Sequence, residues 1–193
     1  MSKVRNNALG FTVIELAVVV LISGVIIAIA TPKITNAMRE YRINIAMRQM
    51  VDTFNHAKAQ AVADNVRSAM MIDTANSRYG MATLTYNAGT ALWVVNTVNY
   101  VSLPQGVTFQ RPTAAPTGVT STGVTSFTVT SPSTLFRQDF TSRGFPVVAA
   151  GADVVSVFIG NGKSYRAITM TSVGGIRTYS TSNLVSAWAD TRY

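Results

Sequence analysis

Residues 11–30, FTVIELAVVVLISGVIIAIA, decide how the rest of the chain can fold. These twenty residues carry a single charge, Glu15. As an α-helix, a segment of this length crosses about 30 Å of hydrocarbon. Inserting a carboxylate at the centre of such a helix costs about 2.5–3.5 kcal/mol of free energy on insertion scales. Glu15 is therefore unfavourable in a membrane helix that has no partner for it. The segment therefore predicts a membrane-spanning helix with one residue that requires a partner.

A short polar leader precedes this segment. The leader, MSKVRNNALG, carries Lys3 and Arg5 and ends in Gly10. A secretory signal peptide is cut after its apolar run, which removes the run. Here the only plausible small-residue site, between Gly10 and Phe11, lies before the run, so cleavage would leave the helix on a mature chain that begins at Phe11. The positive flank places the leader in the cytoplasm and the bulk of the chain outside it.

The residues around this site resemble the class III leader of type IV pilins and pseudopilins. The resemblance lies in Gly10, Phe11 and Glu15, and in Pro32, where many of those proteins have a helix-bending proline. It implies cleavage after Gly10 by a prepilin peptidase and N-methylation of Phe11. It also implies assembly in which Glu15 engages the amine of an adjacent subunit. The implied partners are other pilin or pseudopilin subunits, the peptidase, an inner-membrane assembly platform, and membrane lipid before assembly. The alternative is a plain N-terminal anchor with an accidental glutamate.

The composition restricts the number of domains, the charged partners and the kinds of chemical site that the chain can have. With 193 residues, the chain suits one domain plus its membrane helix. Its formal charge of +8 could suit nucleic acid or anionic lipid. However, only 12% of residues are charged, and the densest basic set is the loose trio Arg39, Arg42 and Arg48, which favours a scattered solvated surface. Cysteine is absent, which excludes disulfides, thiol nucleophiles and thiolate metal sites.

The helical pattern continues beyond the membrane segment. Pro32 should bend the helix near its membrane exit, and no Gly or further Pro occurs before Gly80. Two apolar stripes follow on roughly opposite faces. An outer stripe comprises Ile34, Met38, Tyr41 and Ile45, and an inner stripe comprises Ile43, Met47, Met50, Phe54, Ala57 and Ala61. We expect the inner stripe to dock on the chain's own sheet and the outer stripe to face neighbouring subunits. The alternative is a single irregular amphipathic helix.

After residue 65 the pattern changes to the alternation of β-strands. We expect strands at 66–72, 78–86, 91–95, 99–103, 107–110, 124–130, 154–160, 163–170 and 176–180, with a surface loop at 111–123 and a turn at 143–146. The dipeptide Asn161-Gly162 predicts a tight hairpin turn with positive φ at both residues. The predicted fold is α+β, a long N-terminal helix packed on a mostly antiparallel β-sheet head. It is divided into a leader (1–10), a membrane or filament-core segment (11–30), an amphipathic helix (31–65) and a β-rich head (66–193).

A second resemblance concerns the head. The segment FNHAKAQAVADNVRSAMMI, residues 54–72, resembles a pattern in one pseudopilin subgroup. In that pattern an alanine, a basic residue and an alanine are followed by an asparagine before a strand. That subgroup contains the secretion-system minor pseudopilin H and the fimbrial minor pilin T. The downstream series also resembles it, at Phe140, 143–144, 154–159, 168–170 and 175–177.

No motif for catalysis stands out. The sequence has no Gly-rich phosphate loop, no His-Glu-x-x-His and no Gly-x-Ser-x-Gly, and its eight acidic residues are scattered. The only histidine, His56, is expected at the surface. We therefore expect no enzyme, no cofactor and no metal site.

The expected function is structural. The sequence favours a minor subunit of a type IV pilus or type II secretion pseudopilus, anchored by one span in the inner membrane with an extracytoplasmic head. The alternative is a minor pilin whose head binds extracellular DNA for uptake. Its candidate contacts, which the last hairpin and strand could bring to one end of the head, are Lys163, Arg166, Arg177 and Arg192. Only Arg177 matches the basic Gly-Arg-x-Arg element of fimbrial T-like proteins.

Overall fold

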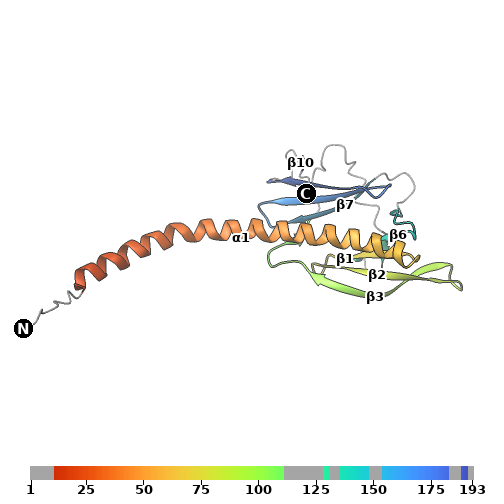
Figure 1. Cartoon of the computed structure of the whole chain (residues 1–193), viewed down its shortest axis with the longest axis horizontal. Helices are drawn as coiled ribbons and strands as arrows, with labels where there is room; N and C mark the ends of the chain where they lie inside the picture. The colour runs from red at the N-terminus through yellow and green to blue at the C-terminus, as the bar shows by residue number, and fades with distance from the viewer. Residues whose placement is uncertain (1–10, 111–127, 131–134, 148–153, 183–187, 191–193) are drawn as a thin grey trace, which may run out of the picture. The chain divides into compact units, whose positions relative to one another are not determined.

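The computed structural model describes residues 11–110, 128–130, 135–147, 154–182 and 188–190. Within them one helix, α1 (Val13–Ala63), is followed by ten strands. The chain divides into two compact units, Met1–Met38 and Arg39–Tyr193. The C-terminal half of α1 thus belongs to the same unit as all the strands (Figure 1). The predicted fold class is confirmed: α+β and pilin-like, with a long apolar N-terminal helix and antiparallel sheets.

The described residues of the first unit form an apolar helix. Its most apolar 18-residue window has a mean hydropathy of 2.9, so by length and composition α1 is able to cross a membrane. Its hydroxyl groups bond to the helix itself: Ser23 Oγ donates to Val19 O at 2.7 Å, and Thr31 Oγ1 donates to Ile27 O at 2.7 Å. Such bonds leave these hydroxyls satisfied without water, which suits a helix in lipid. Pro32 lies inside α1, and the bend expected there remains a prediction.

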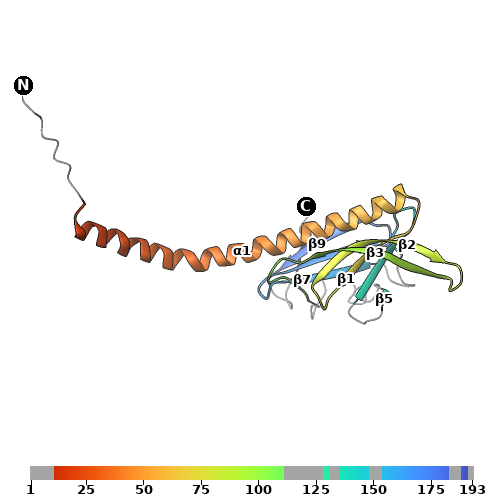
Figure 2. The same cartoon turned by 90° about the horizontal axis from the view of Figure 1, so that it is seen from below.

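Two five-stranded antiparallel sheets contain all the strands of the second unit. The first has the order β3-β2-β1-β6-β5, formed by Leu92–Ser102, Arg78–Asn87, Ser68–Asp73, Leu135–Phe140 and Thr128–Thr130. The second has the order β10-β9-β8-β7-β4, formed by Ala189–Asp190, Ile176–Thr181, Tyr165–Thr171, Val154–Gly160 and Thr108–Phe109. In two perpendicular views, strands of both sheets lie along the stretch of α1 that belongs to this unit (Figure 2).

The inner stripe of α1 forms the centre of the core. All six of its residues are buried, together with Ala46, which the sequence reasoning left out. Phe54 meets the ring of Phe140 edge-on, with centroids 6.4 Å apart. Ser68 Oγ donates to Ala57 O at 2.6 Å and thereby fixes the start of β1 against the helix. The docking of the inner stripe is therefore confirmed.

The outer stripe behaves differently. Tyr41 is 60% exposed, Ile34 and Met38 are also exposed, and Ile45 is half-buried. Within this chain α1 therefore buries its inner stripe and leaves most of its outer stripe exposed. The expectation that the outer stripe faces neighbouring subunits stays a prediction.

Two predicted boundaries were wrong. The two strands predicted at 91–95 and 99–103 are parts of one continuous strand, β3, which begins at Leu92 and ends at Ser102. The polar residue Asn96 broke the alternation in the sequence, but its amide donates across the ladder to Thr85 Oγ1 at 2.8 Å. The register of the β2–β3 pairing shifts between Ala82 and Leu84 on β2, at the place where Asn96 lies on β3.

The β7–β8 hairpin turn is also displaced by one residue. Only Gly162 has a positive φ, +83°, and the turn centres on Gly162 and Lys163. Asn161 stabilises the turn through its side chain, because its Oδ1 accepts hydrogen bonds from the backbone N–H groups of Lys163 at 3.0 Å and Ser164 at 2.8 Å. The predicted turn at 143–146 is present, with Gly144 at φ +77°. The leader, the loop at 111–123 and residues 124–127 lie outside the described residues.

Candidate functional site

The N-terminus of α1 is closed by a capping box made of Thr12 and Glu15. The Thr12 N–H and the Thr12 hydroxyl each donate to Glu15 Oε2 at 2.9 Å. The Glu15 N–H donates in return to Thr12 Oγ1 at 3.2 Å. In such a box a threonine side chain and a glutamate three residues later satisfy each other's free amides, which the first turn of a helix cannot pair internally. The Thr-x-x-Glu spacing was visible in the sequence, and the sequence reasoning missed it.

The box changes how Glu15 should be understood. Its carboxylate already accepts two hydrogen bonds from Thr12 of the same chain, so it is not without a partner at the start of the helix. Phe11 lies immediately before the box and is 86% exposed. Gly10 lies outside the described residues. A new amine on Phe11 would therefore stand one residue from the box, next to the helix end that carries partial positive charge.

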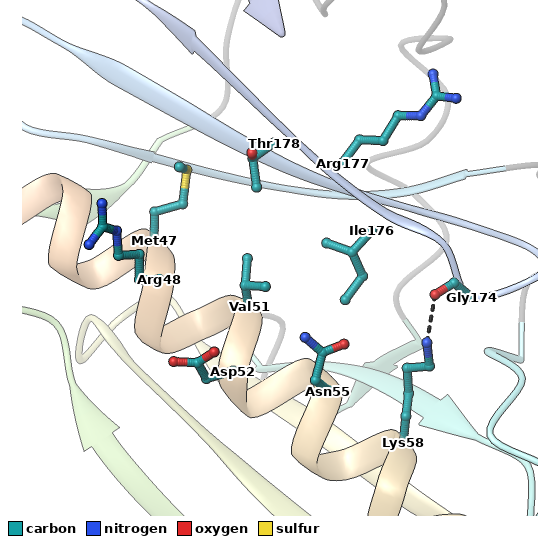
Figure 3. A pocket seen from close by; sticks show the side chains of 10 residues that line it. All are labelled: Met47, Arg48, Val51, Asp52, Asn55, Lys58, Gly174, Ile176, Arg177 and Thr178. Carbon is teal, nitrogen blue, oxygen red and sulfur yellow. Dashed lines mark hydrogen bonds between the residues drawn. The ribbon is translucent and has the colours of Figure 1, made fainter. Parts of the chain in front are cut away.

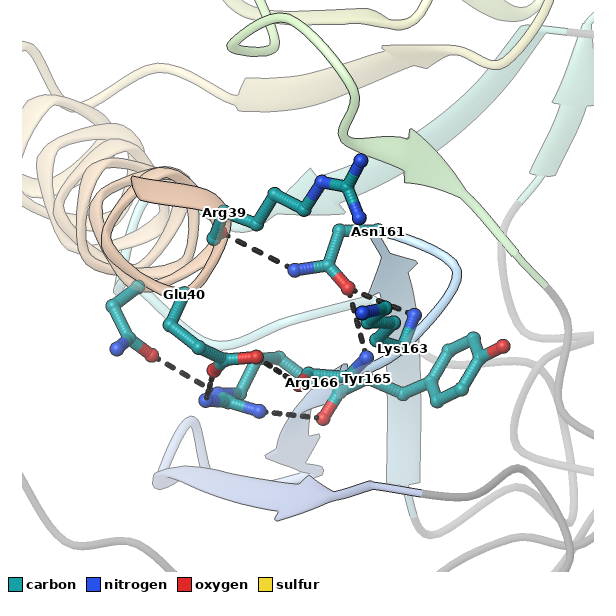
Figure 4. Close-up of polar contacts among 8 residues, drawn as sticks. Arg39, Glu40, Asn161, Lys163, Tyr165 and Arg166 are labelled. Atoms are coloured by element: carbon teal, nitrogen blue, oxygen red, sulfur yellow. Dashed lines mark hydrogen bonds and ion pairs between the residues drawn. The ribbon is translucent and has the colours of Figure 1, made fainter. Parts of the chain in front are cut away.

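Arg166 forms a tie between α1 and β8 (Figure 4). Its Nη2 lies 3.1 Å from Glu40 Oε2, and its Nε donates to Asn44 Oδ1 at 3.1 Å. Its Nη1 donates to Tyr165 O at 3.1 Å, and Glu40 Oε1 accepts from the Ser164 hydroxyl. The side chain of Arg166 is only 11% exposed. Arg166 is therefore a structural arginine whose charge is already paired.

The other predicted DNA contacts are not gathered together. Arg177 pairs with Thr169 in the β8–β9 register, and Thr169 lies six residues along the chain from Lys163. At about 3.3 Å per residue, this places Lys163 and Arg177 roughly 20 Å apart along the strands. Arg192 lies outside the described residues. The structure thus separates the two exposed cations that the sequence reasoning placed at one end of the head.

An open groove runs between α1 and β9 (Figure 3). Its volume is about 1020 Å³. Met47, Val51 and Ile176 give it an apolar floor, and Lys58 closes one end by donating to Gly174 O at 2.6 Å. Charged residues also line the groove, namely Arg48, Asp52 and Arg177.

A second hollow collects three cations that are distant in sequence. It lies between α1 and the β7–β8 hairpin and has a volume of about 530 Å³. Arg39 and Arg42 line it from the helix, and Lys163 lines it from the hairpin. We call this hollow the basic pocket.

On the first sheet, arginines stack on aromatic rings. The guanidinium of Arg67 lies 4.5 Å from the ring centroid of Trp93, and that of Arg78 lies 4.3 Å from Tyr100. Arg78 also pairs with Asp73 at 2.8 Å. Burial of the Asp73 carboxyl raises its pKa, but hydrogen bonds from Asn76 and Arg78 outweigh burial, so the pKa lies below its ordinary value. These pairings were not predicted from the sequence.

The next question is whether acidic and histidine side chains cluster among the described residues. None of them forms a group of three or more His, Cys, Asp or Glu placed to hold a metal ion. His56 is exposed, and its Nδ1 lies 3.4 Å from Met81 Sδ. The groove and the basic pocket are two hollows among the described residues that could hold another molecule.

Comparison with known proteins finds similarity at the level of structure. The chain matches no known protein-family model, and it matches no curated protein. It is similar to a solved structure of the minor pseudopilin EpsH from the Type 2 Secretion System of Vibrio cholerae, at 14% identity and a TM-score of 0.43. The match covers 70% of this chain and 94% of that one.

Proposed function

We propose that this chain is a structural subunit, a minor pilin or pseudopilin, of a type IV pilus or a type II secretion pseudopilus. The observation that carries the proposal is the contrast within α1, a single helix of 51 residues. Near its N-terminus the apolar side chains are exposed all round. Toward its C-terminus the inner stripe is buried against the head's own sheets. A helix that is apolar on every side needs a bilayer or a bundle of similar helices around it.

Such a helix suits both stages of filament assembly. Before assembly, residues 11–30 would lie in the inner membrane, with the head outside the cytoplasm. After cleavage between Gly10 and Phe11, the same residues would pack among those of neighbouring subunits. The prepilin peptidase and the membrane assembly platform are the partners that these steps require.

Glu15 is proposed to fix how far one helix slides along another. Apolar helices offer few directional contacts, so several relative positions have similar energies. A carboxylate that must meet the ammonium on the neighbour's Phe11 selects one of them. Breaking a poorly hydrated charge pair leaves an uncompensated charge, which makes other positions unfavourable.

Two substitutions separate the charge of Glu15 from its role in the capping box. Glu15→Gln keeps an acceptor for the Thr12 donors but removes the charge, whereas Glu15→Val removes both. We expect both variants to insert in the membrane as well as the native chain. Both should lose filament incorporation, by about tenfold if the lost pair contributes about 1.4 kcal/mol.

The measurement is the ratio of subunit in sheared filaments to subunit in the membrane fraction. Native incorporation by Glu15→Gln, together with loss by Glu15→Val, would show that Glu15 acts only as a cap and would contradict the proposed charge pairing. The DNA-uptake alternative gains no support from its predicted contacts, because Arg166 is ion-paired and Lys163 and Arg177 are far apart.

A further inference from the structure

The basic pocket brings together cations that the sequence presents as unrelated. Arg39 and Arg42 lie three residues apart on α1, and therefore on neighbouring positions of one helix face. Lys163 reaches the same hollow from a hairpin more than a hundred residues later. The rest of the lining is uncharged: Gln105, Asn161 and two glycines.

The pocket is held in shape by contacts that leave its centre open. Asn161 Nδ2 donates to Arg39 O at 3.2 Å, which fastens the hairpin to the helix. Arg42 Nη1 donates to Gln105 O at 3.4 Å. Gly106 and Gly162 both have φ near +80°, and a Cβ built on either would meet nothing within 4 Å. The backbone on two sides of the pocket is therefore accessible.

The charges of the pocket are not balanced from within the helix. Glu40 follows Arg39 directly, but it turns away toward Arg166 and Ser164, whereas the Arg39 side chain extends beside Asn161 (Figure 4). Among the described residues, no ion pair engages Arg39 or Arg42. Like charges that converge on one hollow repel each other, and an anion placed there relieves the repulsion.

We propose that the basic pocket binds the phosphate headgroup of an anionic phospholipid and so holds the head at the membrane surface before assembly. The proposal rests on the proposed insertion of residues 11–30. Only nine residues of chain separate Ala30 from Arg39, and in any conformation they span at most about 32 Å. The membrane helix therefore tethers the pocket near the bilayer surface, where anionic headgroups are concentrated.

A lipid headgroup fits this pocket better than a phosphate free in solution. Covalent attachment to the membrane helix keeps the pocket close to a surface where headgroups are concentrated. A free anion would have to bind to three cations without that advantage of local concentration. Each basic residue near an anionic surface strengthens binding by about fivefold.

The test uses the full chain in lipid nanodiscs, either of phosphatidylcholine alone or with about one third phosphatidylglycerol. The readout is hydrogen–deuterium exchange of the amides of residues 105–106 and 161–163. We expect these amides to exchange at least fivefold more slowly in the anionic discs. As an internal control, the backbone amides of the β2–β3 hairpin should exchange at the same rate in both kinds of disc.

Matched variants show whether the pocket is responsible. Arg39→Gln with Lys163→Gln should abolish the difference between discs, since it removes two pocket charges and keeps the backbone contact of Arg39. Arg143→Gln with Arg177→Gln removes two exposed charges elsewhere and should keep the difference. Melting curves check that both double variants are folded.

Three results would overturn the proposal. Equal exchange in the two kinds of disc would mean that the pocket does not recognise anionic lipid. Equal protection by glycerol phosphate in neutral discs would identify a small-anion site instead. Failure of the chain to enter neutral discs at all would refute the proposed membrane helix, and this proposal with it.

Discussion

Replacing Phe54 by alanine tests the arrangement of α1 on the head. Phe54 is 2% exposed and packs edge-on against Phe140. Truncating a buried phenylalanine removes its apolar burial and leaves a cavity, which together cost about 3–5 kcal/mol. For a chain of this size each kcal/mol lowers the melting temperature by about 2–4 °C, so we expect a fall of about 6–20 °C.

Tyr41→Ala is the matched control on the opposite face. Tyr41 is 60% exposed, and substitutions at such positions change stability by about 0.5 kcal/mol or less. Thermal unfolding of the full chain in detergent, followed by tryptophan fluorescence, measures both variants, because Trp93 and Trp188 belong to the second unit. Equal destabilisation by the two substitutions would refute the assignment of an inner and an outer stripe.

Two further predictions concern charged groups of the head. Because the folded-state pKa of Asp73 is lowered, its stabilising effect is complete above the unfolded pKa of about 3.9 and is lost as pH falls through the folded pKa. Arg78→Gln should therefore lower stability at pH 7 slightly and flatten the loss below about pH 4 in melts taken from pH 2.5 to 7; an unchanged slope would contradict this. Arg166→Ala should cost about 1.5–3 kcal/mol, because it removes charged hydrogen bonds, and adding Glu40→Gln should cost less than the sum of the two single changes in denaturant melts. Strict additivity would mean that the two residues do not stabilise each other.

The elements with a strong local period could be predicted from the sequence. The helix was predictable because its inner stripe repeats every three to four residues up to Ala61, and α1 ends at Ala63. The turn after β1 was predictable because Asp73 and Asn76 are residues that bond to their own backbone. The structure has that bond, from the Asn76 N–H to Asp73 Oδ1 at 3.2 Å.

The features that depend on distant pairing were not predictable. Glu40 and Arg166 meet across 126 positions, and nothing in the local pattern of either residue indicates the other. The basic pocket depends in the same way on Lys163 reaching the helix. The continuity of β3 was missed because an exposed edge of a sheet accepts polar residues such as Asn96 when a neighbouring strand supplies a hydrogen bond.

Intact-mass and N-terminal analysis of the chain purified from cells that contain a prepilin peptidase tests the central claim most directly. The account predicts a mature chain that begins at Phe11, with the whole of α1 retained, and a chain with the leader still attached when Gly10 is changed to valine. A mature chain that begins after Ala30, or native processing of Gly10→Val, would contradict it.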